Sequence, residues 1–152
     1  LKRVFPYNFK IIFHPEHAVY ALDHKRSQYY VNKILAGLLA IFPGDGEKLI
    51  GVTNLDLCTP VLSFVFGAAQ FDGDVAVVSL LRLRPEFYDM PHDKGLLVTR
   101  LVKECLHEFG HCYGLVHCDD PSCVMFFSTS VIIIDFKEEK FCPHCSELLQ
   151  KN

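Results

Sequence analysis

The stretch HEFGHCYGLVHC, residues 107–118, carries three histidines, one glutamate, two glycines and a closing cysteine within twelve positions. Positions four apart in an α-helix lie on the same face, so His107 and His111 can point at one metal ion. Glu108 lies beside them in the sequence, close enough to hold a metal-bound water without being a ligand itself. The stretch therefore predicts a helix that carries a metal site on one face.

Gly114 and His117 extend this pattern beyond the helix. Glycine ends helices in a left-handed conformation at no steric cost, so the chain can turn at Gly114 and return His117 to the same ion. Three neutral imidazoles and a water form the open tetrahedral site of catalytic rather than structural zinc. Such a zinc would lower the pKa of its water to about 7, and Glu108 would pass that water's proton to a leaving amine. The alternative, a surface helix with two solvated histidines, does not account for Gly114 and His117 at these offsets.

Four cysteines form a second pattern, C-x4-C followed after 18 residues by C-x2-C. Two close pairs with such a gap are typical of a closed zinc site, in which four thiolates leave no open coordination position. The predicted ligands are Cys118, Cys123, Cys142 and Cys145. The alternatives are four unrelated cysteines, two disulfides, or His144 in place of one cysteine. The odd total of seven cysteines and the lack of a secretory signal argue against a disulfide framework.

Together, HEFGHCYGLVHCDDPSCVMFF and the later CPHC resemble the signature of the archaemetzincins, a branch of the metzincin zinc peptidases. That signature reads H-E-x-x-H-x-x-G-x-x-H-C-x4-C-x-M, then C-x-x-C. The gap between Met125 and Cys142 is 16 residues here, one fewer than in the family pattern. The resemblance also reaches GVTNLDL and FVFGAAQ upstream, so it covers nearly the whole domain. It implies zinc on His107, His111 and His117, Glu108 as general base, a second zinc on the four cysteines, and a Met-turn at Met125 beneath the first zinc.

Hydrophobic periodicity and turn residues predict the order β-α-β-β-β-α before the metal-binding stretch. Asp23 or Ser27 would cap the first helix, an Asp72-Gly73 turn would join a hairpin, and Asp93 would open the helix that runs into His111. The predicted elements are a strand over 9–13, a helix over 23–42, a strand over 49–57, the hairpin over 62–83 and the last helix from 93 to 111.

The predicted fold class is α+β, with a twisted mixed sheet of metzincin type, a backing helix and an active-site helix. Residues 1–152 are expected to form a single metallopeptidase domain. Within it, residues 1–113 would hold the sheet and active-site helix. Residues 114–152 would form a small zinc-stapled subdomain, because this tail is too short to build its own core.

The family layout implies that Gly67, Ala68 and Ala69 lie on the antiparallel edge strand above the cleft. An extended peptide substrate could add to that edge through backbone hydrogen bonds. The alternative is that these small residues only permit close packing.

Phe127 marks a departure from some metzincins, which place a tyrosine two residues after the Met-turn methionine. Phe127 has no hydroxyl, so stabilisation of the oxyanion would come from the zinc alone or from another group. Tyr88 and Tyr113 are candidates for that group by residue type only.

The core-facing side of the predicted active-site helix runs through Leu97, Leu101, Cys105, Phe109 and Cys112. This side lies roughly 100° to 200° around the helix from the histidines. Arg100 and Glu104 are spaced for an i,i+4 pair on the metal-facing side. Cys58, like Cys105 and Cys112, is predicted to be a small buried hydrophobic residue.

Composition narrows the possible functions. Lysine and arginine total 15 against 18 acidic residues, and the net charge of −3 disfavours nucleic-acid binding. No apolar run approaches the roughly 20 residues of a membrane-spanning helix. The predicted function is a cytoplasmic zinc metallopeptidase that hydrolyses peptides or proteins with one catalytic and one structural zinc. The alternative is a zinc-dependent peptide-binding module with little or no turnover. A monomer is the expected oligomeric state.

Overall fold

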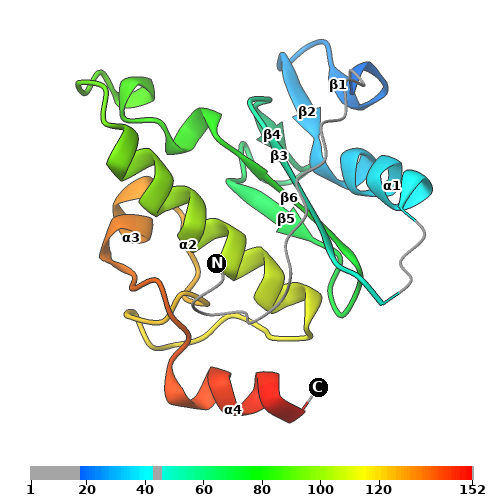
Figure 1. The fold of residues 1–152 in the computed structure, drawn as a ribbon. Coiled ribbons are helices and arrows are strands. Elements are labelled where there is room, and N and C mark those ends of the chain that lie inside the picture. The colour runs from blue at the N-terminus through cyan, green and yellow to red at the C-terminus, as the bar shows by residue number, and fades with distance from the viewer. Residues whose placement is uncertain (1–17, 43–45, 152) are drawn as a thin grey trace.

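The computed structural model describes residues 18–42 and 46–151 and places a small mixed sheet between two helices (Figure 1). Strand order is β3-β6-β5, with β6 parallel to β3 and antiparallel to β5. The bounds are Leu49–Thr53 for β3, Val75–Ser79 for β6 and Gly67–Ala69 for β5. All of β6 is buried. Val77 packs with α1 (Val31–Ile41) and Val78 with α2 (Lys94–Cys112), so the two helices cover opposite faces of the sheet.

The remaining elements are short. A second sheet has the order β1-β2-β4, formed by Leu22–Asp23, Gln28–Tyr30 and Leu57–Cys58. The 3-10 helices are η1 (Val19–Ala21), η2 (Leu81–Leu83) and η3 (Pro85–Tyr88). Helices α3 (Val131–Phe136) and α4 (Pro143–Lys151) follow α2, and α2 lies between the sheet and α3 (Figure 1). None of the described helices is long and apolar enough to span a bilayer.

The predicted fold class is confirmed, and so are several element boundaries. Asp93 is the N-cap of α2, and its carboxylate accepts the backbone N–H of Leu96 at 2.9 Å. The predicted hairpin is the antiparallel pair β5–β6, with Asp72 in its turn at φ 49°. The region predicted as a strand over 49–57 is divided into β3 and β4. The strand predicted over 9–13 lies outside the described residues, and the division at residue 113 stays a prediction.

The helix predicted over 23–42 is wrong in its first eight positions, because α1 begins only at Val31. The Asp23 carboxylate instead accepts the backbone N–H groups of Lys25 and Arg26 and the hydroxyl of Tyr30. These hydrogen bonds stabilise a turn between β1 and β2. An aspartate side chain that binds nearby backbone N–H groups in this way competes with helix formation. Ser27 lies in that turn at φ 51° and caps no helix.

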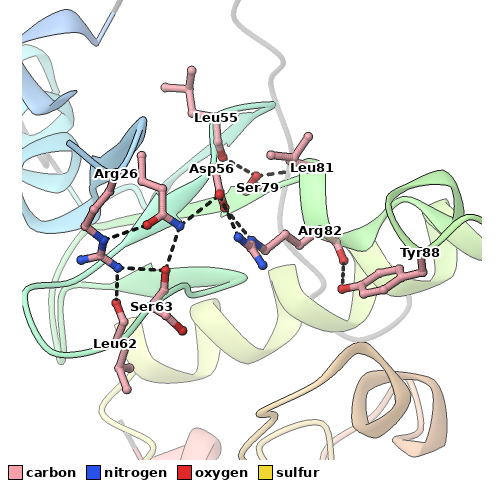
Figure 2. Close-up of polar contacts among 10 residues, drawn as sticks. Arg26, Leu55, Asp56, Leu62, Ser63, Ser79, Leu81, Arg82 and Tyr88 are labelled. Carbon is pink, nitrogen blue, oxygen red and sulfur yellow. Dashed lines mark hydrogen bonds and ion pairs between the residues drawn. The ribbon is translucent and has the colours of Figure 1, made fainter. Parts of the chain in front are cut away.

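A polar network holds the segment that leads into β5 (Figure 2). The Arg26 guanidinium donates to the carbonyls of Thr59, Leu62 and Ser63, each at 2.9 Å. Asp56 accepts two hydrogen bonds from Arg82, at 2.6 and 2.8 Å, and a third from Gln28 at 3.0 Å (Figure 2). Because these donors fix a loop without regular structure, they hold one wall of the cleft described below.

The metal-facing side of α2 is buried rather than open to solvent. Arg100 and Glu104 do not pair with each other as the i,i+4 spacing predicted. Arg100 instead donates to both Asp135 carboxylate oxygens at 2.7 and 2.6 Å. Glu104 lies 3.2 Å from the ammonium of Lys137. The apolar side agrees with prediction, since Cys105 and Cys112 are buried in the core, as is Cys58.

Candidate active site

The structure brings the three predicted histidines together at the end of α2. His107 and His111 lie one turn apart on the helix, and the chain returns His117 to them through Gly114, whose φ is 76°. One ring nitrogen from each histidine lies within 4.8 Å of the others. The Nε2 atoms of His107 and His111 are 3.2 Å apart. Nitrogens at the usual zinc distance in a tetrahedron are about 3.3 Å apart, so this donor set fits a zinc ion.

Backbone carbonyls orient two of these rings. His107 Nδ1 donates to the carbonyl of Val124 at 2.9 Å, and His111 Nδ1 donates to that of Leu115 at 2.7 Å. A carbonyl can only accept, so the hydrogen is on Nδ1 and the Nε2 lone pairs are free for a metal. Burial lowers the pKa of His107 well below its usual value and also lowers those of His111 and His117. The rings are therefore neutral, which is the form that binds zinc.

Met125 lies beneath the histidine helix, as the Met-turn prediction implied. Met125 is fully buried, and a Cβ built on Gly110 would lie 2.3 Å from its sulfur. Only glycine at position 110 therefore allows the helix to sit this close to Met125. The sequence interpretation missed Gly110, although a glycine inside a helix is itself a signal of close approach.

Glu108 lies in the cleft beside the histidines, between α2 and β5. Its side chain is buried, and a Cβ on Gly67 would lie 2.8 Å from its Oε1 atom. Burial raises the pKa of Glu108 well above its usual value, and the negative charge of Glu104 adds to the effect. A cation on the histidines would oppose this shift, because an opposite charge nearby favours the ionised carboxylate.

The cleft is a cavity of about 500 Å³ that the histidines and Glu108 share with two loops and a strand. Its lining includes Gly67, Ala68 and Ala69 of β5, residues 62–66, and residues 127–129. Strand β5 pairs with β6 on one side only within the described residues, so it is an edge strand. Both interpretations of these small residues therefore have support: Gly67 permits close packing, and the strand has a free edge.

Neither tyrosine considered for the oxyanion lines this cavity. The Tyr88 hydroxyl donates to the carbonyl of Arg82, and the Tyr113 ring lies under the ammonium of Lys48. Phe127 does line the cavity, with its ring centroid 4.7 Å from that of His117. Its neighbour Ser128 also lines it, and among the described residues Ser128 Oγ is the only buried side-chain nitrogen or oxygen without a hydrogen-bond partner. No sequence signal marked this serine.

The four predicted cysteines form a second cluster, whose sulfurs lie within 4.8 Å of one another. Cys118 Sγ and Cys142 Sγ are 3.8 Å apart, the separation of about 3.8 Å expected for two thiolates on one tetrahedral zinc. Backbone N–H groups donate to two of the sulfurs, from Cys142 to Cys123 and from Cys145 to Cys142. All seven thiols are free, so the disulfide alternative has no support. His144 is exposed and absent from the cluster.

Comparison with known proteins identifies the family. The sequence matches peptidase family M54 over residues 5–151. The archaemetzincin of Methanocaldococcus jannaschii is 42% identical over 132 residues, covering 87% of this chain and 72% of that protein. A zinc-dependent peptidase from Methanocorpusculum labreanum has a TM-score of 0.80 at 37% identity, over 91% of this chain and 81% of that one. An archaemetzincin from Archaeoglobus fulgidus, solved with malonate, has a TM-score of 0.83 at 33% identity, over 97% and 85%. The chain therefore belongs to the archaemetzincins of peptidase family M54 and is a zinc metallopeptidase.

Proposed function

We propose that the chain hydrolyses peptide bonds in the cleft between β5 and α2, with zinc on His107, His111 and His117 and with Glu108 as general base. The observation that carries this proposal is the convergence of three neutral imidazoles beside a buried carboxylate in one cavity. Zinc held there would supply a Lewis acid that acidifies a water and polarises a carbonyl. The predicted ligands, the base and the substrate strand all line this one cavity.

Glu108 performs the proton transfers in this mechanism. Its carboxylate accepts a proton from the attacking water as the water oxygen bonds to the carbonyl carbon of the peptide. Glu108 then gives that proton to the amide nitrogen as the carbon–nitrogen bond breaks. The products are a carboxylic acid and an amine, and the carboxylate is restored. Gly67 contributes by leaving room for the Glu108 side chain beside β5.

The substrate is a peptide or protein segment in an extended conformation. It adds to the free edge of β5 along Gly67, Ala68 and Ala69, where backbone groups supply the hydrogen bonds. The Ser128 hydroxyl has no partner in the described part of the chain, and rotation of this side chain toward the cavity that it lines would let it donate a further hydrogen bond to a substrate carbonyl. Phe127, whose ring is half exposed, gives the same wall an apolar surface.

A second zinc on Cys118, Cys123, Cys142 and Cys145 has a structural role. Four thiolates fill a tetrahedral zinc and leave no position for substrate. Seven free thiols suit a reducing compartment, which supports a cytoplasmic location.

The direct test is digestion of a peptide library by the zinc-loaded protein, followed by mass spectrometry, with Glu108→Gln alongside. The amide replaces a proton acceptor without changing size, so kcat/KM should fall by about 10²- to 10⁴-fold while zinc content is unchanged. Equal cleavage by the two proteins would refute the role of Glu108. A peptide that binds uncleaved, and equally well to Glu108→Gln, would support the alternative of a peptide-binding module.

A further inference from the structure

A buried lysine lies next to the histidine site, in contact with residues that support it. Lys137 follows α3 directly, and its side chain is fully buried. Its ammonium contacts three oxygens: Glu104 Oε1 at 3.2 Å, the Val124 carbonyl at 3.1 Å and the Phe126 carbonyl at 3.3 Å. An ammonium has three N–H donors, so each has an acceptor. This matched set makes a buried cation tolerable at this position.

The three acceptors belong to the two elements that build the histidine site. Glu104 is on α2, three residues before His107. Val124 and Phe126 are the neighbours of the Met-turn methionine, so Lys137 joins the helix to the Met-turn. The Val124 carbonyl also accepts from His107 Nδ1 at 2.9 Å. A carbonyl oxygen has two lone pairs, so one oxygen can serve both Lys137 and His107.

We infer that Lys137 is a positioning residue for the histidine metal site: it fixes the Val124 carbonyl that orients His107. This inference deepens the proposed function and rests on it. A carbonyl bonded to the His107 ring sets the direction of its Nε2 lone pair, and such outer contacts commonly govern metal affinity. Without the ammonium, the Val124 carbonyl keeps one donor, the His107 ring. The peptide segment is then held by the hydrogen bonds from Val124 N–H to the Lys140 carbonyl and from Cys118 N–H to the Met125 carbonyl.

A second buried pair in the same interface provides a matched control. Arg100 is also on α2 and buried, and it binds Asp135 of α3 in two places. Its remaining contact is the Leu83 carbonyl at 2.9 Å, so none of its hydrogen bonds reaches the Met-turn. Loss of either pair weakens the packing of α2 on α3, but only loss of Lys137 removes a donor from the Val124 carbonyl.

The experiment compares two double variants with the wild type. Lys137→Met with Glu104→Gln removes one pair without leaving a buried charge, and Arg100→Met with Asp135→Asn removes the other. Thermal unfolding measures the stability of each protein. Competition with a chromophoric chelator measures the dissociation constant of the more weakly held zinc. Nitrogen NMR of labelled histidines reports whether His107 keeps its Nδ1 hydrogen and binds metal through Nε2.

Both double variants should melt at lower temperature. Only the Lys137 variant should lose zinc affinity at the histidines, by about 10- to 100-fold. Lys137→Arg, which keeps the charge, should fall between it and the wild type, and it serves as the test if the double variant does not fold. Equal histidine-site affinity in wild type and Lys137 variants, or an equal loss in the Arg100 control, would overturn the inference. Failure of the wild type to bind zinc at its histidines would instead refute the proposed function.

Discussion

The histidine cluster and the cysteine cluster meet at adjacent residues, yet they differ in burial and in the ligand atoms that they offer. His117 is exposed, and its cluster lines a cavity that it shares with a buried carboxylate. Cys118 is the next residue, and the other three cysteines of its cluster are buried. Solvent access, rather than position in the sequence, therefore distinguishes a metal site suited to catalysis from one suited to stabilising the fold.

The two clusters also differ in what supports them. Two of the histidines lie on α2, a helix of 19 residues that packs against the sheet, and His117 follows it closely in the chain. The cysteines come from loops and from the start of α4, and they are themselves much of the local core. Metal should therefore contribute little to stability at the histidines and much at the cysteines.

The strongest test of this contrast exchanges one ligand in each cluster. Cys142→Ser should lower the free energy of unfolding by more than about 4 kcal/mol, because it removes a ligand of the proposed structural zinc, around which the local core is built. His111→Ala should lower it by only about 1 kcal/mol, through its lost bond to the Leu115 carbonyl. Urea unfolding of both variants measures the two losses. Similar losses would mean that the histidine site is structural as well.

A smaller loss of stability is expected at Met125, which lies close to both clusters. Met125 packs with three of the cysteines and also lies against Gly110 of the histidine helix. Gly110→Ala would place a methyl group 2.3 Å from the Met125 sulfur, so it should cost about 1–3 kcal/mol through overpacking.

Gly95→Ala is the matched control for that variant. Gly95 is in the same helix, and its added methyl would meet only the Asp93 side chain at 3.3 Å. Helix propensity favours alanine, so Gly95→Ala should leave the melting temperature unchanged or raise it. If both variants behave alike in thermal melts, the contact between α2 and the Met-turn is looser than the structure shows.

The smallest predicted effect is a loss of activity on substitution of Ser128, in the wall of the histidine cavity. Ser128→Ala removes one neutral hydroxyl, so kcat/KM for a cleaved peptide should fall by about 2- to 12-fold, equivalent to about 0.5–1.5 kcal/mol. Ser130→Ala is a suitable control, because Ser130 follows Ser128 closely but is absent from the cavity lining. No change in Ser128→Ala, measured with zinc content held equal, would exclude a contact between this hydroxyl and the substrate.

The spacing of the histidines and cysteines predicted both clusters, and the resemblance to the archaemetzincin signature indicated the family and its fold. A helix fixes the relation between His107 and His111, and a glycine at position 114 allows the turn, so the histidine cluster needed no distant information. The predicted start of α1 was wrong because the Asp23 side chain binds nearby backbone groups in a turn. Such local hydrogen bonds compete with helix formation.

Partners that come from far along the chain could not be predicted in this way. Glu104 and Lys137 are 33 residues apart, and Arg100 and Asp135 are 35 apart. An i,i+4 pattern on the helix offered a nearer partner, and tertiary packing overrode it. Ser128 was missed for the same reason, since its lack of a partner is visible only once the cavity is formed.

We propose that one chain holds an open zinc at its histidines and a closed zinc at its cysteines. The most direct measurement is the zinc content per chain of the wild type and of His117→Ala, by mass spectrometry under native conditions. Two zincs are expected in the wild type and one in the variant, which should keep its fold and lose peptide cleavage. A wild type with one zinc, or a variant that keeps two, would rule out this assignment of the two sites.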